Sequence, residues 1–296
     1  MNALRKKKFN SALIFFLFVF PAFAAVLLSV EIPFVMSIGY SFTRWNGLDR
    51  VPAFIGLENY RELFLDDPVM MNALSFTFKQ AVFVVILINV IALFLAVLLD
   101  REIRGKNIFR AAFFIPNIMS LIVIGYIWRF IFSRSLDSFY EAVKLPFLMY
   151  SWLGNPNLAF ISIMIVTVWQ AIGFYMIIYI AGLQVIPRDL IEASMIDGAG
   201  EISRFFKITL PLLMPSITVA VFYSISNSLK SFDVIFTLTG GGPGSSTTPI
   251  ALDIYKTAFV TSRFGYGTAK SVVLFLLILL ITFFQIRFFK KREVEV

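Results

Sequence analysis

The sequence of 296 residues contains neither cysteine nor histidine. These two absences exclude disulfides, zinc centres built on thiolate or imidazole ligands, Ser-His and Cys-His nucleophilic pairs, and imidazole proton relays. Charged residues are also scarce, since they make up 15% of the chain, whereas soluble domains contain about 25%. The composition therefore argues against a soluble enzyme, and no catalytic or metal site is predicted.

The chain also lacks a loop that could bind the phosphates of a nucleotide. Such a loop needs two glycines and a lysine at fixed spacing, but Phe264 and Ala269 occupy the two glycine positions of the nearest candidate. A second glycine-rich stretch, residues 240–246, contains no lysine. We therefore predict that this chain binds no nucleotide cofactor.

Apolar residues dominate what is present, at 59% of the chain with a mean hydropathy of +0.84. A helix of about 20 apolar residues crosses a bilayer, and the uncharged intervals of the sequence predict six such helices. A turn cluster at 154–157 places the start of one of them near Leu158. We predict an all-α integral membrane protein with a single transmembrane domain over residues 1–296. The predicted spans are approximately residues 10–32, 78–99, 109–131, 158–186, 209–236 and 268–289.

The formal charge of +8 is distributed unevenly along the chain. Lys and Arg are denser at both termini and in the connections after the second and fourth spans than in the other connections. Because cytoplasmic loops are enriched in Lys and Arg, both termini are predicted to be cytoplasmic, and no nucleic-acid partner is predicted. The basic residues 5–8 and the Ala-Phe-Ala sequence at 22–24 imitate a signal peptide, but the apolar run continues to Val30, which favours a retained first span.

The cytoplasmic connection between the fourth and fifth spans, residues 187–208, is longer than a small bundle requires. Pro187 and the acidic residues after it are typical of a helix start, and Gly198 and Gly200 are typical of a helix end. Small residues recur there, so the backbone of another protein could approach closely. We predict a short helix along the membrane, with Glu192 and Asp197 facing away from lipid.

The residues of this connection follow the order E-A-S-x-x-D-G-A from Glu192 and F-x-x-I-x-L-P-x-x-x-P from Phe205. This order resembles the EAA loop of ATP-binding-cassette importer permeases, in which the loop forms a coupling helix seated in a cleft of the ATPase subunit. The usual alanine of the third position is Ser194 here, which would add a hydroxyl at the contact. By this resemblance, the residues that couple to the ATPase are Glu192, Ala193, Ser194, Asp197, Gly198 and Ala199.

The external stretches 41–47 with 56–60, and 231–236 with 239–244, resemble the carbohydrate-uptake branch of that family. The subunit type is similar to the maltose, oligosaccharide and glycerol-phosphate permeases. The resemblance implies a permease subunit, not an enzyme, that carries a sugar such as an oligosaccharide across a bacterial-type cytoplasmic membrane by alternating access. The implied partners are a second permease subunit in a heterodimer, two ATPase subunits and an extracytoplasmic solute-binding protein.

Three alternatives stay open from the sequence. An ion-coupled secondary transporter would have similar spans, although few buried acids and no histidine argue against a proton relay. A membrane-embedded enzyme or assembly factor is another possible class of protein, and the lack of a nucleophile-base set argues against the enzyme. Within the importer hypothesis, a phosphorylated polyol such as glycerol phosphate is the alternative cargo.

A sugar path needs hydrogen-bonding groups and aromatic faces inside the membrane. In the fifth span three serines recur at i, i+4 and i+7 beside an asparagine, and in the fourth span a threonine, a glutamine and a phenylalanine recur at i, i+3 and i+7. Polar groups are costly when they face lipid, so both stripes could face a shared cavity. The alternative is that these side chains bond helix carbonyls or mediate helix contact. The predicted path residues are Thr167, Gln170, Phe174, Ser224, Asn227, Ser228 and Ser231.

Overall fold

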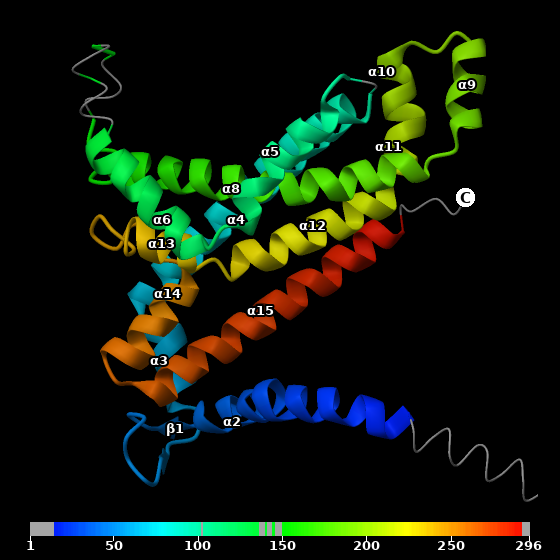
Figure 1. Ribbon diagram of the computed structural model, residues 1–296. Helices are drawn as coiled ribbons and strands as arrows, with labels where there is room; N and C mark the ends of the chain where they lie inside the picture. The colour runs from blue at the N-terminus through cyan, green and yellow to red at the C-terminus, as the bar shows by residue number, and fades with distance from the viewer. Residues whose placement is uncertain (1–14, 102, 136–139, 141–143, 146–149, 292–296) are drawn as a thin grey trace, which may run out of the picture. The chain divides into compact units, whose positions relative to one another are not determined.

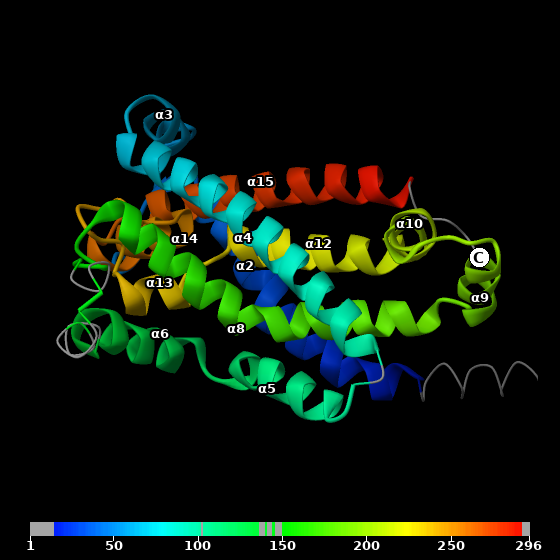
Figure 2. The same ribbon diagram turned by 90° about the horizontal axis from the view of Figure 1, so that it is seen from above.

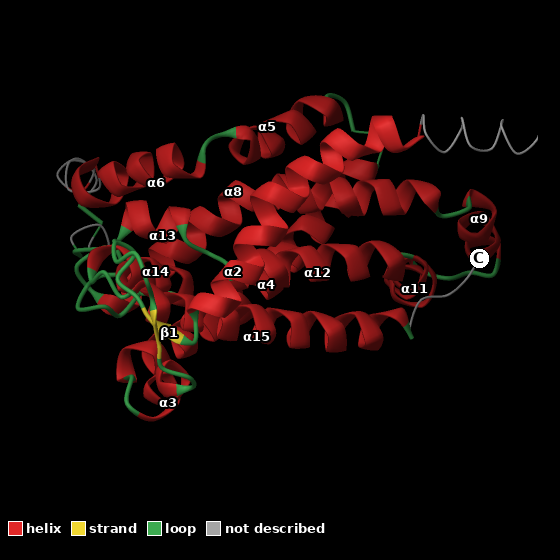
Figure 3. Ribbon diagram, turned by 90° about the horizontal axis from the view of Figure 1, so that it is seen from below, coloured by secondary structure: helices red, strands yellow, loops and turns green. Residues whose placement is uncertain are grey.

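The computed structural model describes residues 15–101, 103–135, 140, 144–145 and 150–291, most of which are helical (Figure 1 and Figure 3). The chain divides into two compact units. One contains residues 1–66 and 254–273, and the other contains residues 67–253 and 274–296. We call them the first and second units. All of the predicted coupling and path residues belong to the second unit.

The first unit combines long helical segments with a small hairpin. Its helix over Phe15–Tyr40 includes the π-helical η1 (Leu27–Glu31) and the α-helical α2 (Ile32–Tyr40). The strands β1 (Thr43–Arg44) and β2 (Ala53–Phe54) pair antiparallel, with Thr43 opposite Phe54. The unit is completed by α3 (Glu58–Leu65), η5 (Lys256–Val260) and the first part of α15 (Phe264–Lys290).

The first unit brings together the stretches 41–47 and 56–60. The buried Asn59 side chain donates hydrogen bonds of 2.9 Å to the carbonyls of both Ser41 and Thr43. The Tyr60 and Ser41 hydroxyls lie 2.7 Å apart, within hydrogen-bonding distance. Buried backbone carbonyls require such partners, so these side chains hold the hairpin against α3.

The second unit is a helical bundle. Its long helices are α4 (Pro68–Asp100) and α8 (Pro156–Val185), which pack against each other. Shorter helices complete it and are, in chain order, α5 (Lys106–Ile118), α6 (Leu121–Phe130), η2 (Ile131–Ser135), α9 (Arg188–Ile196), α10 (Glu201–Arg204), η4 (Phe205–Thr209), α11 (Leu210–Leu212), α12 (Met214–Leu229) and α13 (Asp233–Leu238). The helix α14 (Ile250–Tyr255) begins in the second unit and ends in the first.

Both long helices of the second unit start at an Asx-Pro pair. The Asp67 carboxylate accepts a hydrogen bond of 2.8 Å from the Met70 amide, and Pro68 occupies the first helical position of α4. The Asn155 side chain accepts bonds from the amides of Asn157 and Leu158 at the start of α8. Each cap satisfies amides that lack an intrahelical partner. The observed start of α8 at Pro156 lies close to the predicted start near Leu158.

Within the described residues, four helices are long and apolar enough to cross a membrane, or up to six spans if two bent helix pairs each count as one. The four are Phe15–Tyr40, Pro68–Asp100, Pro156–Val185 and Phe264–Lys290. The bent pairs are Lys106–Ile118 with Leu121–Arg134, at 96°, and Glu201–Leu212 with Met214–Leu229, at 70°. Residues 10–14 of the first predicted span lie outside the described part of the chain.

Two predicted spans differ from the observed helices. The predicted span 109–131 is broken, because Met119 and Ser120 are extended and Pro116 removes a backbone donor near the end of α5. The predicted span 209–236 is also interrupted, because α12 ends at Leu229 and a separate helix, α13, begins at Asp233. Ser231 therefore lies in the break and does not continue the helical stripe that begins at Ser224.

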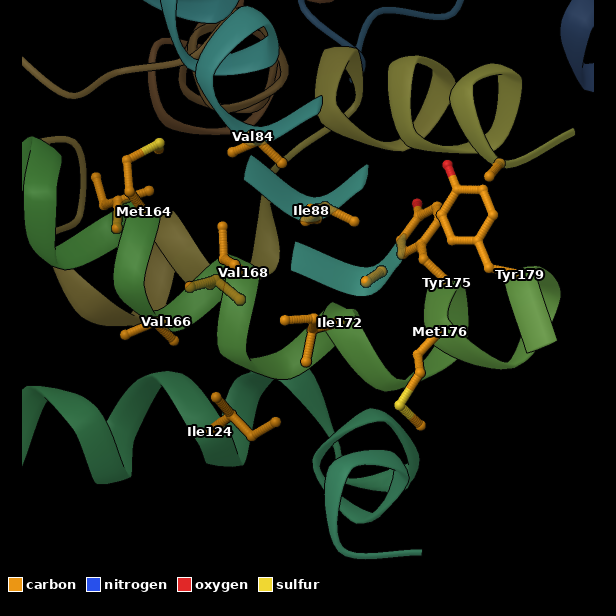
Figure 4. Packing of buried hydrophobic residues seen from close by; sticks show 14 of the residues in the cluster. Val84, Ile88, Ile124, Met164, Val166, Val168, Ile172, Tyr175, Met176 and Tyr179 are labelled. Carbon is orange, nitrogen blue, oxygen red and sulfur yellow. The ribbon is translucent and has the colours of Figure 1, made fainter. Parts of the chain in front are cut away.

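The core of the second unit lies where α4, α8 and α6 meet, and Figure 4 shows it from close by. Val84 and Ile88 of α4, Ile172 of α8 and Ile124 of α6 belong to this core, and all four are buried. A Cβ atom at Gly173 would overlap the backbone of Phe113, so this glycine allows α5 and α8 to approach closely. The bundle thus holds α8 on several sides.

Candidate functional site

The connection between α8 and α12 forms a projecting hairpin. The backbone is extended at Ile186 and Pro187, and α9 then runs for nine residues to Ile196. After the turn at 197–200 the chain returns through α10 and η4. Figure 1 and Figure 2 both show α9 and α10 at one end of the second unit, beyond the end of α8. We call residues 187–209 the α9–α10 hairpin.

The turn of this hairpin is a Schellman motif, a helix ending that requires a left-handed residue. Gly198 has φ +78°, and its amide donates a hydrogen bond of 3.1 Å to the Met195 carbonyl. The Ala199 amide donates a bond of 3.0 Å to the Ser194 carbonyl. Glycine is favoured at this position because side chains rarely adopt positive φ. The helix α9 ends at Ile196, two residues before Gly198, because the backbone at Gly198 is left-handed.

The predicted coupling residues do not all face outward. Glu192, Ala193, Asp197 and Gly198 are exposed, and Ala199 is partly buried. Ser194 is buried, and its hydroxyl donates a hydrogen bond of 2.6 Å to the Ile191 carbonyl. The expectation that Ser194 adds a hydroxyl at an outer contact is therefore wrong, because this hydroxyl bonds its own helix.

Large apolar side chains are exposed on both sides of the turn. Ile196, the last residue of α9, is 87% exposed, and Ile202 of α10 is 77% exposed. Exposed apolar groups that gather at a polar rim are typical of an interaction surface. The tip of the hairpin therefore has the composition of a contact site.

A cavity of about 830 Å³ separates the hairpin from the ends of the long helices. Arg101, directly after α4, and Glu201 of α10 both line it and form an ion pair of 3.0 Å. Their side chains are 59% and 68% exposed, so solvent screening leaves the pair little stabilising effect. The hairpin is thus weakly held at this point.

Basic residues gather at this same end of the second unit. The C-terminal end of α4 is followed by Arg101 and Arg104, and α5 begins with Lys106, while Arg204 belongs to α10. Figure 1 and Figure 2 show these ends beside the hairpin and show α13 at the opposite end of the unit. Basic residues therefore lie beside the hairpin at this end of the second unit.

The two predicted path stripes meet through aromatic rings. The rings of Phe174 and Tyr223, on α8 and α12, lie 5.0 Å apart between centroids. The ring of Tyr175 lies 6.2 Å from that of Tyr223 between centroids. Figure 4 shows the hydroxyls of Tyr175 and Tyr179 pointing to the same side of α8. Tyr223 is exposed, and so is Asn227, one helical turn later on α12.

The other predicted path residues lie in different surroundings. The buried Ser224 hydroxyl accepts a hydrogen bond of 3.0 Å from Asn89, and Ser231 accepts one of 3.0 Å from Gln80, both on α4. Ser228 is buried, and Gln170 is partly exposed. Thr167 is partly buried, and its hydroxyl oxygen has no hydrogen-bond partner within the described chain. Ser224 and Ser231 therefore mediate helix contact in this structure.

Sequence reasoning missed the polar residues of the second span and one aromatic residue in each of the fourth and fifth spans. Gln80 and Asn89 are uncharged, so they did not interrupt the apolar interval from which the span was predicted. Amides inside a membrane helix are a usable signal, since they need partners. Tyr179 and Tyr223 carried no such signal, because aromatic residues also pack in apolar cores.

The sequence matches the family model described as "Binding-protein-dependent transport system inner membrane component" over residues 102–294. It is 42% identical to the probable starch degradation products transport system permease protein of Thermoanaerobacterium thermosulfurigenes, over 99% of each chain. It is 36% identical to the multiple sugar-binding transport system permease protein of Streptococcus mutans, over 88% of this chain and 90% of that protein.

Identity to the trehalose/maltose transport system permease protein of Thermococcus litoralis is 33%, over 95% of each chain. The fold is similar to a chain in the crystal structure of a bacterial ABC transporter involved in the import of the acidic polysaccharide alginate. The TM-score is 0.80 with 18% identity, over 96% of this chain and 98% of that one. At this identity the likeness concerns the fold alone.

Proposed function

This chain belongs to the family of inner-membrane components of binding-protein-dependent transport systems, and from that premise we propose that it is the permease subunit of an ATP-driven sugar importer. It is a multi-pass membrane protein and a transport subunit, not an enzyme. The observation that carries the proposal is the 42% identity, along the whole chain, to a probable permease for starch degradation products.

The cargo is a sugar, and an oligosaccharide in particular. Starch degradation products, multiple sugars, and trehalose or maltose are the cargoes in the names of the three relatives. A phosphorylated polyol such as glycerol phosphate stays the alternative cargo within the same importer hypothesis. The ion-coupled secondary transporter is the alternative mechanism, and the two mechanisms differ in their energy source.

ATP dependence is tested with the complete importer in proteoliposomes. We expect maltose-type oligosaccharide uptake to require ATP and the solute-binding protein, and to persist when an uncoupler abolishes the ion gradient while ATP stays high. Uptake should persist because an importer driven by nucleotide hydrolysis takes its free energy from ATP and not from the ion gradient. Uptake that stops with the uncoupler at constant ATP would instead support the ion-coupled transporter. Glycerol phosphate is added as a competitor, and inhibition of sugar uptake by it would support the alternative cargo.

The coupling element of the proposal is the α9–α10 hairpin, with Glu192, Ala193, Ser194, Asp197, Gly198 and Ala199 as its coupling residues. Its exposed apolar tip at Ile196 and Ile202 supports a protein contact. The cavity behind the hairpin leaves room for displacement relative to α4. An ATPase subunit that holds this tip would push or pull the hairpin when nucleotide binding changes its shape, since only differential binding can shift a conformational equilibrium.

The importer contains further subunits. We propose a heterodimer with a second permease subunit, two ATPase subunits that bind ATP-Mg, and an extracytoplasmic solute-binding protein. A solved relative in fold is the alginate ABC transporter in complex with a pentasaccharide-bound periplasmic protein, with a TM-score of 0.77, 18% identity, and 94% coverage of each chain. The family description itself supports the binding protein. Co-purification of these subunits in detergent tests the composition.

The sugar path runs along the contact between α8 and α12. Phe174 and Asn227 of the predicted stripes, together with Tyr223, which the stripes did not include, offer aromatic faces and an exposed amide. Thr167, Gln170, Ser224, Ser228 and Ser231 belong to the same proposal. Ser224 and Ser231 hold α12 in position beside the path, because their hydroxyls are hydrogen-bonded to side chains of α4.

We also propose six spans in one transmembrane domain, with both termini in the cytoplasm of a bacterial-type cell. Each bent helix pair then counts as one span. The hairpin lies on the cytoplasmic side, and the glycine-rich loop after α13 lies outside. The distribution of Lys and Arg supports this orientation.

The absence of cysteine makes the orientation directly testable. We expect Lys207→Cys, in the hairpin, to react with a membrane-impermeant maleimide only in inside-out vesicles. Ser246→Cys, after α13, is expected to react only in right-side-out vesicles, since both positions are exposed. The unchanged chain is the control for background labelling. Labelling of both variants from one side would contradict the proposed topology.

A further inference from the structure

Asn89 joins three helices of the second unit through its side-chain amide. The Tyr179 hydroxyl of α8 donates a hydrogen bond of 2.5 Å to Asn89 Oδ1. Asn89 Nδ2 donates to the Ser224 hydroxyl of α12 at 3.0 Å and to the Val85 carbonyl of its own helix at 2.7 Å. The amide therefore uses both its donor and its acceptor group, and we call this contact the Asn89 junction.

The Asn89 junction is enclosed by protein. Tyr179 and Ser224 are each 1% exposed, and Asn89 is partly buried. Its neighbour Ile88 belongs to the apolar core. A polar group at this depth finds little water, so a lost partner leaves the remaining groups unsatisfied. The three side chains therefore depend on one another.

A second contact joins α4 to α12 without α8. Gln80 Nε2 donates a hydrogen bond of 3.0 Å to the Ser231 hydroxyl, directly beyond α12. The order of the pairs, Gln80 with Ser231 and Asn89 with Ser224, shows that the two helices run antiparallel. Only the Asn89 junction, of these two contacts, includes α8.

The α9–α10 hairpin connects to the same helices. Its first end continues from α8 through Ile186, and its second end continues into α12. Tyr223, beside Ser224 in sequence, belongs to the proposed sugar path. The Asn89 junction thus lies beside the proposed path and includes the two helices that receive any displacement of the hairpin.

We propose that Asn89 is a positioning residue that makes α4, α8 and α12 move as one body during transport. The inference rests on the proposed function. With the junction intact, a displacement of the hairpin reaches the Tyr223 face of α12. Without it, α8 and α12 shift independently, so that ATP hydrolysis continues while fewer sugars cross.

The first test measures ATP hydrolysed per sugar imported by the complete importer. We expect Asn89→Leu to raise this ratio about tenfold, a size typical of coupling between sites. Tyr179→Phe removes only one hydroxyl and is expected to raise the ratio severalfold. The double variant should match Asn89→Leu, since both changes break one contact. The control is Asn72→Leu, an exposed asparagine on the same helix.

A wild-type ratio in Tyr179→Phe and Asn89→Leu, with only a lowered melting temperature, would overturn the proposal. Additive effects of the two changes would overturn it as well. If Asn89→Leu fails to fold, the ratio of ATP hydrolysed to sugar imported in Tyr179→Phe alone tests the proposal. A purely structural role lowers the amount of protein and leaves the ratio unchanged.

The second test does not require sugar transport. Nitroxide labels on Ile177 of α8 and Phe222 of α12, both exposed, report the separation of these helices. We expect one narrow distance distribution with and without ATP in the wild-type complex, and a broader one in Tyr179→Phe. Equal widths would reject the junction. Absence of sugar uptake by the wild type would reject the proposed function separately.

Discussion

Replacement of Gly198 by valine is expected to lower sugar uptake at least about tenfold while ATP hydrolysis continues. A left-handed backbone costs an L-residue about 1–2 kcal/mol, and about 1.4 kcal/mol corresponds to a factor of ten in a population. Gly198 has φ +78°, and an added Cβ would meet no atom within 4 Å of it in this chain. The expected cost is therefore conformational: the Schellman turn opens and the hairpin tip changes shape.

Two further variants distinguish a change in the backbone conformation of the turn from a steric clash between the new side chain and a partner subunit. Gly198→Asn is expected to keep most of the uptake, because asparagine tolerates positive φ better than other side chains. Gly200→Ala is the matched control, since Gly200 has φ −65° and free space around it. Equal loss in the valine and asparagine variants would indicate that a partner needs the bare backbone. Normal coupled uptake by the valine variant would contradict the role of this turn.

Replacement of Tyr223 by alanine is expected to reduce uptake by about tenfold or more. Its ring contacts Phe174 across the interface of α8 and α12, yet it is 43% exposed. An aromatic contact is worth about 0.5–1.5 kcal/mol beyond the area that it buries. Loss of the ring would remove both this contact and the apolar face proposed for the sugar. Initial uptake rates at saturating binding protein measure the effect.

The control for this change is Tyr126→Ala on α6. Tyr126 is 55% exposed, so the two changes remove the same side chain from similarly exposed positions. We expect near-normal uptake for Tyr126→Ala and an altered preference among oligosaccharides for Asn227→Ala. Unchanged rates and preferences for Tyr223→Ala and Asn227→Ala together would remove the α8–α12 contact from the sugar path.

Helix positions in this chain are largely predictable, because the membrane makes long uncharged intervals the dominant signal. The helix over residues 156–185 starts at the predicted turn cluster, since Asn155 and Pro156 satisfy and preset its first turn. The breaks at Met119 to Ser120 and after Leu229 were not predictable in the same way. Hydropathy records only how apolar an interval is, and not whether its backbone stays helical.

The roles of the polar residues in the spans were predictable only in part. A stripe of serines at helical spacing indicates a shared face, but it does not say which helix covers that face. The structure places Asn89 and Gln80 against Ser224 and Ser231, respectively. Those partners are far apart in sequence, so no local pattern could pair them. Asn227 and Tyr223 remain exposed by the same packing.

The sequence by itself determined that the chain needs a membrane, where its apolar intervals lie and where the helix after the fourth span ends. These properties depend on composition and on a few neighbouring residues, such as the glycine at 198. Only the tertiary structure decided that Ser194 faces inward, that Phe174 meets Tyr223, and that Asn89 joins three helices. Such contacts depend on how distant segments pack, because a hydrogen bond or a ring contact forms only between atoms that the fold brings together.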